Sequence, residues 1–173
     1  SSAASDVYKR QVLGLTMGMQ PIVGYNFGAQ KIDRVKQTLK LGIVSGVVIT
    51  SSGFFICELF PHAVSAIFTD SDHLIDLAVD GLRITVIMFP FVGAQIVIGN
   101  FFQSIGKAKI SIFLSLTRQL LYLLPCLLLF PNWWGLKGIW ISMPVSDALA
   151  FITAVVSLII YIKKVSKQHL IAE

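Results

Sequence analysis

The chain has 173 residues, of which 55% are hydrophobic and only 13% are charged. Soluble domains carry about a quarter of their residues as charged side chains, so this composition excludes an ordinary soluble enzyme and favours a membrane protein. At about 20 residues per membrane-spanning helix, the length allows roughly five or six spans. Cys57 and Cys126 each lie in an apolar stretch, which indicates buried thiols rather than a disulfide or a metal site.

The net charge of +5 is explained by where the charges lie along the chain. Basic residues gather in 31–40, in the turn at 106–109 and in the C-terminal tail, whereas five of the nine acids lie within 58–80. This alternation follows the positive-inside rule, and it lacks the basic stripe with interleaved aromatic residues that nucleic-acid binding needs. We therefore expect the basic segments and the C-terminus to be cytoplasmic, and we expect no nucleic-acid partner.

Residues 1–10, SSAASDVYKR, differ sharply in composition from the rest of the chain and do not begin with methionine, so we predict a non-native or artefactual leader. Within the basic connector 31–40, apolar residues recur at helical spacing, which predicts a short interfacial helix. Residues 131–135 are predicted to form a turn with interfacial tryptophans. Long apolar stretches predict an all-α membrane protein with five transmembrane helices, over about 11–30, 41–60, 78–105, 110–130 and 137–162, before a cytoplasmic tail over 166–173.

Four of the five predicted spans contain an internal proline: Pro21, Pro90, Pro125 and Pro144. Each proline removes a backbone donor and disturbs the helix, which membrane bundles tolerate where neighbours satisfy the freed groups. Broken helices are common in transporters that rock around a central site. We interpret Pro21, Pro90 and Pro144 as candidates for helix breaks or gating.

Four glycines, Gly14, Gly18, Gly24 and Gly28, recur at close intervals in the first predicted span. They fit close packing between membrane helices, which relies on small residues. They also fit a flexible wall beside a substrate passage, and the two interpretations are compatible, with helix packing the one that the pattern favours.

Arg118 and Asp147 are the two charges deepest in the predicted spans. Arg118 lies about nine residues past the cytoplasmic turn and Asp147 about ten past the external turn, or about 13 and 15 Å along a helix. Charges at that depth are costly and are usually paired or face water, so we expect both to face the bundle interior and to approach each other. Two interpretations stay open: a structural ion pair, or an Asp147 that gains and loses a proton during transport.

Uncharged polar residues in the spans, Gln20, Asn26, Gln95, Asn100 and Gln103, are predicted to form interhelical hydrogen bonds. Gln95 and Asn100 follow Pro90 near mid-span and are the better candidates to line a cavity. Together with Arg118 and Asp147 they form the set of candidate residues for a substrate or ion pathway.

No constellation of catalytic residues emerges from the sequence. His62, His73 and His169 all lie outside the apolar spans and lack the spacing of metal ligands. There is no phosphate-binding loop and no nucleophile elbow. We therefore predict no enzymatic activity, no bound metal and no cofactor.

Three stretches, QPIVGYNFGAQKIDRVKQTLK, NFFQSIGKAKISIFLSLTRQ and GLKGIWISMPVSD, resemble the bacterial branch of the multidrug and toxic compound extrusion (MATE) family. They occur in the family's order and spacing, and the resemblance covers nearly everything from about residue 12 onward. It implies that residues 11–165 correspond to helices eight to twelve of a twelve-helix transporter made of two six-helix lobes. The chain would then be a truncated C-terminal lobe that lacks the first lobe and the seventh helix.

The resemblance further implies a secondary active antiporter in a bacterial inner membrane, which exports drugs or organic cations in exchange for H⁺ or Na⁺. The partners implied are the lipid bilayer, the organic cations and the N-terminal lobe of the same polypeptide. Some branches of the family carry an acidic cation ligand in the tenth helix, but the comparable stretch here, Phe89 to Gln103, contains no acid. The coupling ion is therefore unassigned. Two alternatives remain: a lipid-linked saccharide flippase of the related superfamily, and a non-transporting membrane scaffold.

Overall fold

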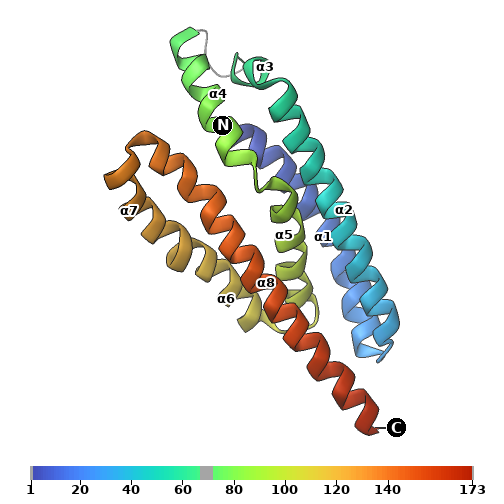
Figure 1. Ribbon diagram of the computed structural model, residues 1–173. Coiled ribbons are helices and arrows are strands. Elements are labelled where there is room, and N and C mark those ends of the chain that lie inside the picture. Colours follow the sequence, from blue (N-terminus) through green and yellow to red (C-terminus); the bar gives the residue numbers. More distant parts are fainter. Residues whose placement is uncertain (1, 67–71, 173) are drawn as a thin grey trace.

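The computed structural model describes residues 2–66 and 72–172, and the side chains of 10–66 and 73–165. Every regular element within these residues is a helix, which confirms the predicted all-α class. The elements are α1 (Ser2–Gly28), α2 (Ile32–Leu59), α3 (Pro61–Ala66), α4 (Asp72–Val86), α5 (Phe89–Ser104), α6 (Ala108–Leu116), η1 (Thr117–Leu123), α7 (Leu124–Trp134) and α8 (Leu136–Ala172) (Figure 1). α6, η1 and α7 follow one another without a loop and form one long helical rod.

Three helical stretches within the described residues are long and apolar enough to cross a membrane: Ile32–Leu59, Ala108–Trp134 and Leu136–Val165. A fourth candidate consists of α4 and α5 taken together, which are bent by 50° at a short break. α1, which contains the first predicted span, is helical but does not meet this criterion. The predicted number of five spans is therefore approximate.

Residues 31–40 do not form a separate short helix, because α2 begins at Ile32 and runs to Leu59. Buried Val35 and Leu39 recur at the same three- and four-residue spacing as buried Gly42 and Gly46. The buried stripe thus continues through the basic connector, and no proline interrupts it, so the connector and the span become one helix.

The turn predicted at 131–135 is shorter than expected. α7 continues through Pro131 to Trp134, and the chain reverses at Gly135, whose φ is 55°. The Gly135 N–H still donates to the Pro131 carbonyl at 2.9 Å, which completes the last turn of the helix. A glycine adopts this positive φ without strain, so one residue is enough to end α7 before α8 begins.

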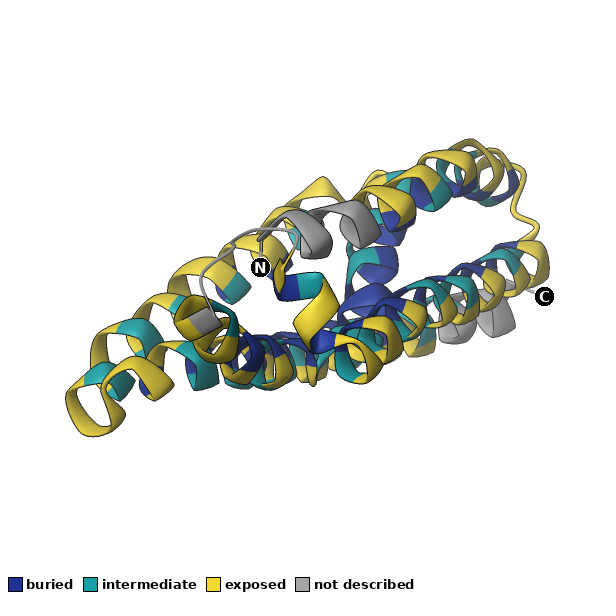
Figure 2. Ribbon diagram, turned by 90° about the horizontal axis from the view of Figure 1, so that it is seen from above, coloured by how far each residue is buried: buried dark blue, intermediate teal, exposed yellow. Residues whose placement is uncertain are grey.

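The helices form two groups that meet along α5 and α8. α1, α2 and α5 make one group, and the α6–η1–α7 rod folds back on α8 as an antiparallel hairpin (Figure 1). Buried residues gather where the groups meet, whereas the hairpin becomes mostly exposed toward the α7–α8 turn (Figure 2). The main hydrophobic core includes Val23, Leu39, Val97 and Phe102 of the first group, and α8 joins it through Ala154 and Leu158.

α2 and α5 approach each other closely at two glycines. A Cβ added at Gly46 would lie 3.0 Å from the Cγ2 of Val97 and 3.1 Å from the Gly93 carbonyl oxygen. A Cβ added at Gly93 would collide with the Gly46 carbonyl oxygen. One turn further along α2, the Thr50 hydroxyl donates to that same Gly46 oxygen at 2.9 Å. The absence of side chains therefore sets the spacing of these two helices, as is usual in membrane bundles.

The four glycines of the first predicted span behave differently. A Cβ added at Gly14, Gly18 or Gly28 would meet no atom of the described residues within 4 Å. Only at Gly24 does a neighbour come close, the Ser104 carbonyl oxygen at 3.3 Å. Close packing against described residues is therefore found at one of the four.

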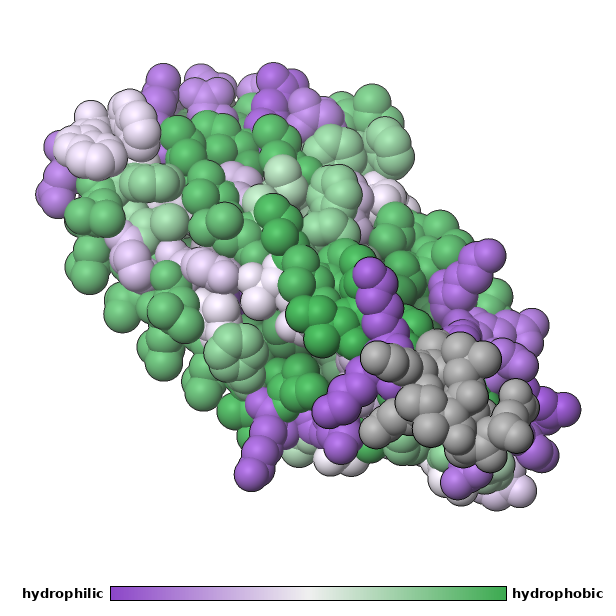
Figure 3. Space-filling model, turned by 60° about the horizontal axis from the view of Figure 1, so that its bottom comes forward, coloured by the Kyte–Doolittle hydropathy of each residue, from purple (hydrophilic) through white to green (hydrophobic). Residues whose placement is uncertain are grey.

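The three basic segments lie at one end of the molecule, where the α1–α2 turn, the α5–α6 turn and the end of α8 come together (Figure 1). Hydrophilic side chains lie at that end and also along the opposite edge of the view, and hydrophobic side chains cover most of the body between them (Figure 3). The side of the membrane that this end faces stays a prediction.

Candidate functional site

A widened helical segment, η1, lies in the middle of the α6–η1–α7 rod. Its residues, Thr117–Leu123, are π-helical, and the Leu124 N–H still reaches back five residues to the Gln119 carbonyl. The segment ends just before Pro125, the second residue of α7, which has no N–H to bond back into the rod. The position of Pro125 thus marks where the ordinary α-helix resumes. π-helical turns within α-helices are frequent at functional sites.

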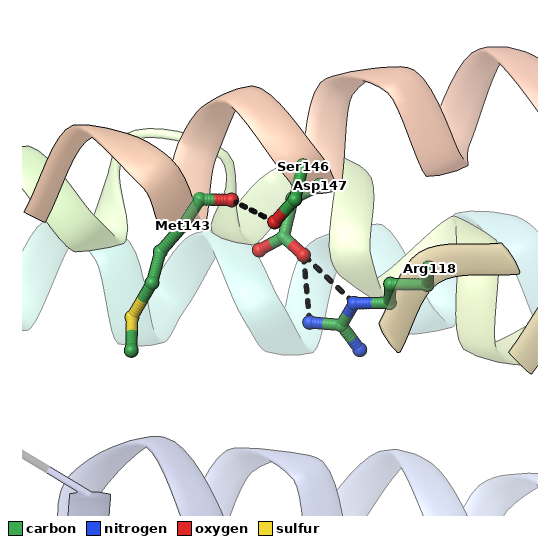
Figure 4. Close-up of polar contacts among 4 residues, drawn as sticks. All are labelled: Arg118, Met143, Ser146 and Asp147. Atoms are coloured by element: carbon green, nitrogen blue, oxygen red, sulfur yellow. Dashed lines mark hydrogen bonds and ion pairs between the residues drawn. The ribbon is translucent and has the colours of Figure 1, made fainter. Parts of the chain in front are cut away.

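Arg118 of η1 contacts Asp147 of α8 (Figure 4). The Arg118 Nε donates to the Asp147 Oδ1 at 2.8 Å, and the Arg118 Nη2 lies 2.7 Å from the same oxygen. The side chain of Asp147 is 10% exposed and that of Arg118 is 30% exposed. The two deepest charges of the predicted spans therefore meet across the hairpin, and their part in an ion pathway stays a prediction.

The geometry of this pair leaves one oxygen of Asp147 open. Both contacts from Arg118 end on Oδ1, instead of spreading over both carboxylate oxygens as two parallel hydrogen bonds. No donor among the described residues bonds to Oδ2, which points away from the guanidinium (Figure 4). The neighbouring Ser146 hydroxyl donates to the Met143 carbonyl at 2.8 Å rather than to Asp147. Oδ2 is therefore available as an acceptor for a proton, a water molecule or a cation.

A second polar contact, between the Tyr122 Oη and the Thr153 Oγ1 at 2.8 Å, also joins η1 to α8. The Thr153 hydroxyl donates its own proton to the Leu149 carbonyl at 2.9 Å, so Tyr122 is the donor to Thr153. Neither residue stood out in the sequence. The sequence feature that could have indicated Tyr122 is its position one helical turn after Arg118, which places both side chains on one face of the helix.

Gln95 and Asn100 lie on α5, and neither is hydrogen-bonded to Arg118 or Asp147. The Asn100 Oδ1 accepts a hydrogen bond from the Gln20 Nε2 of α1 at 3.3 Å, and its Nδ2 donates to the Ile96 carbonyl at 2.9 Å. Gln95 is buried, and its Oε1 has no partner within the described part of the chain. The same holds for the Oγ1 of Thr117, next to Arg118. Asn100 thus forms an interhelical hydrogen bond, while a cavity-lining role for either residue stays a prediction.

The three proline candidates differ in their effect on the backbone. Pro90 is the second residue of α5 and directly follows the 50° bend. Pro21 and Pro144 lie inside α1 and α8, which continue through them as helices, so the predicted breaks are not found there. Membrane bundles tolerate such prolines when the surrounding helices support the backbone, and Pro144 is buried. A gating role for all three stays a prediction.

Both cysteines are free thiols; Cys57 is buried, as predicted, and Cys126 is half-buried. Within the described residues, no group of three or more His, Cys, Asp and Glu side chains is arranged to hold a metal ion.

A family model described as MatE matches residues 6–128, more than two thirds of the chain. The match begins inside the segment predicted as a leader. The multidrug export protein MepA of Staphylococcus aureus is 25% identical over 152 residues, which cover 87% of this chain and 33% of MepA. The MepA of Staphylococcus haemolyticus is 23% identical over 138 residues, or 80% and 30% of the two chains. This chain thus spans about a third of the length of the curated relatives that it matches.

Solved structures give the same match. The MATE multidrug transporter DinF-BH is 39% identical with a TM-score of 0.80, over 85% of this chain and 33% of that one. A multidrug resistance MATE family transporter of the MOP superfamily, in its inward-facing conformation, is 19% identical with a TM-score of 0.89, over 95% and 39% of the two chains. The second likeness concerns the fold alone.

Proposed function

This chain belongs to the MatE family, whose members are transporters rather than enzymes, and we propose that it works as part of a secondary active antiporter. The antiporter exports drugs or organic cations in exchange for H⁺ or Na⁺. It resides in a bacterial inner membrane with the C-terminus in the cytoplasm, and residues 11–165 face an N-terminal lobe of the same polypeptide. The family match, the apolar helices and the function for which the Staphylococcus aureus relative is named, multidrug export, support this proposal.

The observation that carries the proposal is the shielded Arg118–Asp147 pair with its open Oδ2. In this proposal the coupling ion binds to Asp147, while Arg118 holds the carboxylate in place through Oδ1. A proton or Na⁺ on the carboxylate offsets its negative charge and weakens its attraction to the guanidinium. The contact between η1 and α8 then depends on whether the ion is bound, which is the property that coupling requires.

The π-helical backbone of η1 offers a physical route for the change to spread. A return of η1 to α-helical hydrogen bonding shifts the register by one residue and rotates the side chains of one flank by about 100° relative to the other. Arg118 and Tyr122 both lie on η1, so such a shift changes both of its polar contacts with α8 together.

The transport function is tested with the full-length transporter in proteoliposomes loaded with a fluorescent organic cation. A proton gradient and a sodium gradient are imposed separately at constant membrane potential, and cation flux is followed by fluorescence. We expect flux with one of the two gradients and its loss when the matching ionophore collapses that gradient. Flux that is independent of both gradients, or no cation flux by correctly folded protein, contradicts antiport.

The role of Asp147 is tested with the double variant Arg118→Gln, Asp147→Asn, which removes both charges and leaves no unpaired charge behind. We expect this variant to fold and to bind the organic cation but to lose gradient-driven flux. Retained coupled flux would assign the pair to structure alone. The matched control is Arg83→Gln with Glu58→Gln, because the Arg83 Nε lies 3.8 Å from the Glu58 Oε1 and both side chains are well exposed.

A further inference from the structure

An open groove of about 970 Å³ lies at the end of the molecule where the basic segments gather. Three separate parts of the chain form it: the α1–α2 turn, the α5–α6 turn with the start of α6, and residues 157–165 of α8. Figure 3, in which this end comes forward, shows hydrophilic side chains here and, across the hydrophobic body, at the opposite edge. The groove shares no residue with the Arg118–Asp147 pair, which lies beyond it along the rod.

The charged residues that line the groove, Lys107 and Lys164, are both basic, and no acid is among the described residues lining it. Lys107 precedes the first turn of α6, and Lys164 lies in the C-terminal third of α8, so the two ammonium groups belong to different parts of the chain. The positive end of the α6 dipole adds to the same field. The electrostatics of the groove therefore favour an anion.

Most of the remaining lining is apolar and includes Ile105, Ile110, Phe113 and Ile160. Phe113 is 54% exposed and Ile160 is 62% exposed, so apolar surface continues from the groove onto the outer face of the helices. A soluble anion would leave this apolar surface uncovered, and an apolar ligand would leave the two lysines without a counter-charge. The groove therefore matches an amphiphile with an anionic head and hydrocarbon tails.

We propose that this groove binds an anionic phospholipid, with the headgroup phosphate between Lys107 and Lys164 and the acyl chains along Phe113 and Ile160. The site lies at a helix end, where basic residues of membrane proteins meet the headgroup layer. The proposal depends on the chain's location in a bilayer and does not depend on antiport.

The test places a reporter in the groove of the full-length transporter. Phe113→Trp is introduced into a protein whose other tryptophans, including Trp133, Trp134 and Trp140, are replaced by phenylalanine. The variant is reconstituted in phosphatidylcholine bilayers with increasing amounts of dibrominated phosphatidylglycerol, whose bromines quench tryptophan fluorescence on contact. The reciprocal series uses dibrominated phosphatidylcholine in phosphatidylglycerol, and the two curves together give the relative affinity for the two lipids.

We expect a clear preference for phosphatidylglycerol, and a loss of about five-fold in relative affinity for each of Lys107→Gln and Lys164→Gln. Lys107→Arg and Lys164→Arg keep the charge and restore the preference. The matched control is Lys109→Gln, which removes an exposed lysine two residues from Lys107 that does not line the groove, and it leaves the preference unchanged.

Two results overturn the proposal. Equal losses in Lys109→Gln and Lys107→Gln would show that diffuse surface charge, and not the groove, attracts the lipid. Relief of quenching by inorganic phosphate, but not by chloride at the same ionic strength, would show a site for soluble anions. All of these lysines are exposed, so we expect their replacement to leave the core intact. Each outcome is therefore read only on protein whose elution profile matches that of the parent.

Discussion

The α1–α2–α5 group and the α6–η1–α7/α8 hairpin are both built from apolar helices, yet different contacts predominate between their helices. In the first group, α2 and α5 approach backbone to backbone at Gly46 and Gly93. In the hairpin, α7 has no buried residue, and two polar contacts join η1 to α8. Lipid chains are as apolar as leucine side chains, so hydrophobicity alone does not select a partner for a membrane helix. Close backbone packing is the more prominent contact in the first group and polar pairing in the hairpin, although the first group also has the Gln20–Asn100 hydrogen bond and the hairpin also has Gly138 close to the Phe130 carbonyl.

This difference separates a rigid region from a responsive one. Contacts between glycine backbones depend on distance alone and do not change when an ion binds. The Arg118–Asp147 contact depends on charge, and the close glycine approach in its hairpin, Gly138 to the Phe130 carbonyl, lies near the turn and away from that pair. We therefore expect the first group to act as a frame and the hairpin to contain the part that moves.

The largest expected effect is that of Gly93→Ala on stability. The added Cβ collides with the Gly46 carbonyl oxygen, and backbone cannot move aside as a flexible side chain does. We expect a loss of about 3 kcal/mol in the free energy of unfolding, at the upper end for overpacked cores. Unfolding of the purified full-length transporter in a mixed-micelle titration with dodecyl sulfate measures it.

Gly18→Ala is the control for that substitution, because a Cβ at Gly18 meets no described atom within 4 Å and alanine favours a helix. It should leave stability unchanged or raise it slightly. If both variants lose stability equally, helix spacing at Gly93 does not hold the first group together, and the contrast between the two regions fails.

A smaller loss in the free energy of unfolding is expected from Asp147→Ala, which leaves the Arg118 guanidinium without its partner. Removing one member of a buried pair costs about 3–5 kcal/mol, but Arg118 is 30% exposed and retains access to polar surroundings, so we expect about 2 kcal/mol. The same dodecyl sulfate titration measures it.

Adding Arg118→Met to Asp147→Ala should recover most of that loss, because no buried charge then lacks a partner. Glu58→Ala serves as the control, since its contact with Arg83 is long and exposed and is expected to contribute at most about 0.5 kcal/mol. A double variant that is no more stable than Asp147→Ala would mean that the loss reflects packing around Asp147 rather than charge.

The two regions also differ in how far the sequence predicts them. Arg118 and Asp147 were predicted to meet because opposite charges at similar depth on consecutive spans have few other partners in an apolar medium. The glycine contact was not predicted, because it depends on how α2 and α5 are rotated against each other, which no local pattern specifies. The glycines of α1 recur more regularly and gave the stronger pattern in the sequence. At three of those four glycines, however, an added Cβ would meet no described atom within 4 Å.

The backbone of the candidate site was predicted only in part. Pro125 indicates a disturbed helix, but a kink, a break and a π-helical turn can each accommodate the loss of one backbone N–H donor. The choice among them depends on the packing of α8 against the rod. In the connector 31–40 the prediction of the backbone was wrong. Its charges suggested a separate helix, but the buried stripe through Val35 and Leu39 makes it part of α2.

The smallest expected effect is that of Tyr122→Phe, which removes the hydroxyl that donates to Thr153. Hydrogen bonds between membrane helices contribute about 0.6 kcal/mol on average, because the unfolded chain also finds partners, and we expect a loss of that size. A double-mutant cycle with Thr153→Val, measured by the same titration, isolates the pair, and Tyr25→Phe is the control at an exposed tyrosine. A coupling near zero would leave Arg118–Asp147 as the polar contact that orients the hairpin. A coupling well above about 1 kcal/mol would mean that η1 is held to α8 at two comparable points, so that loss of the ion pair alone would not release it.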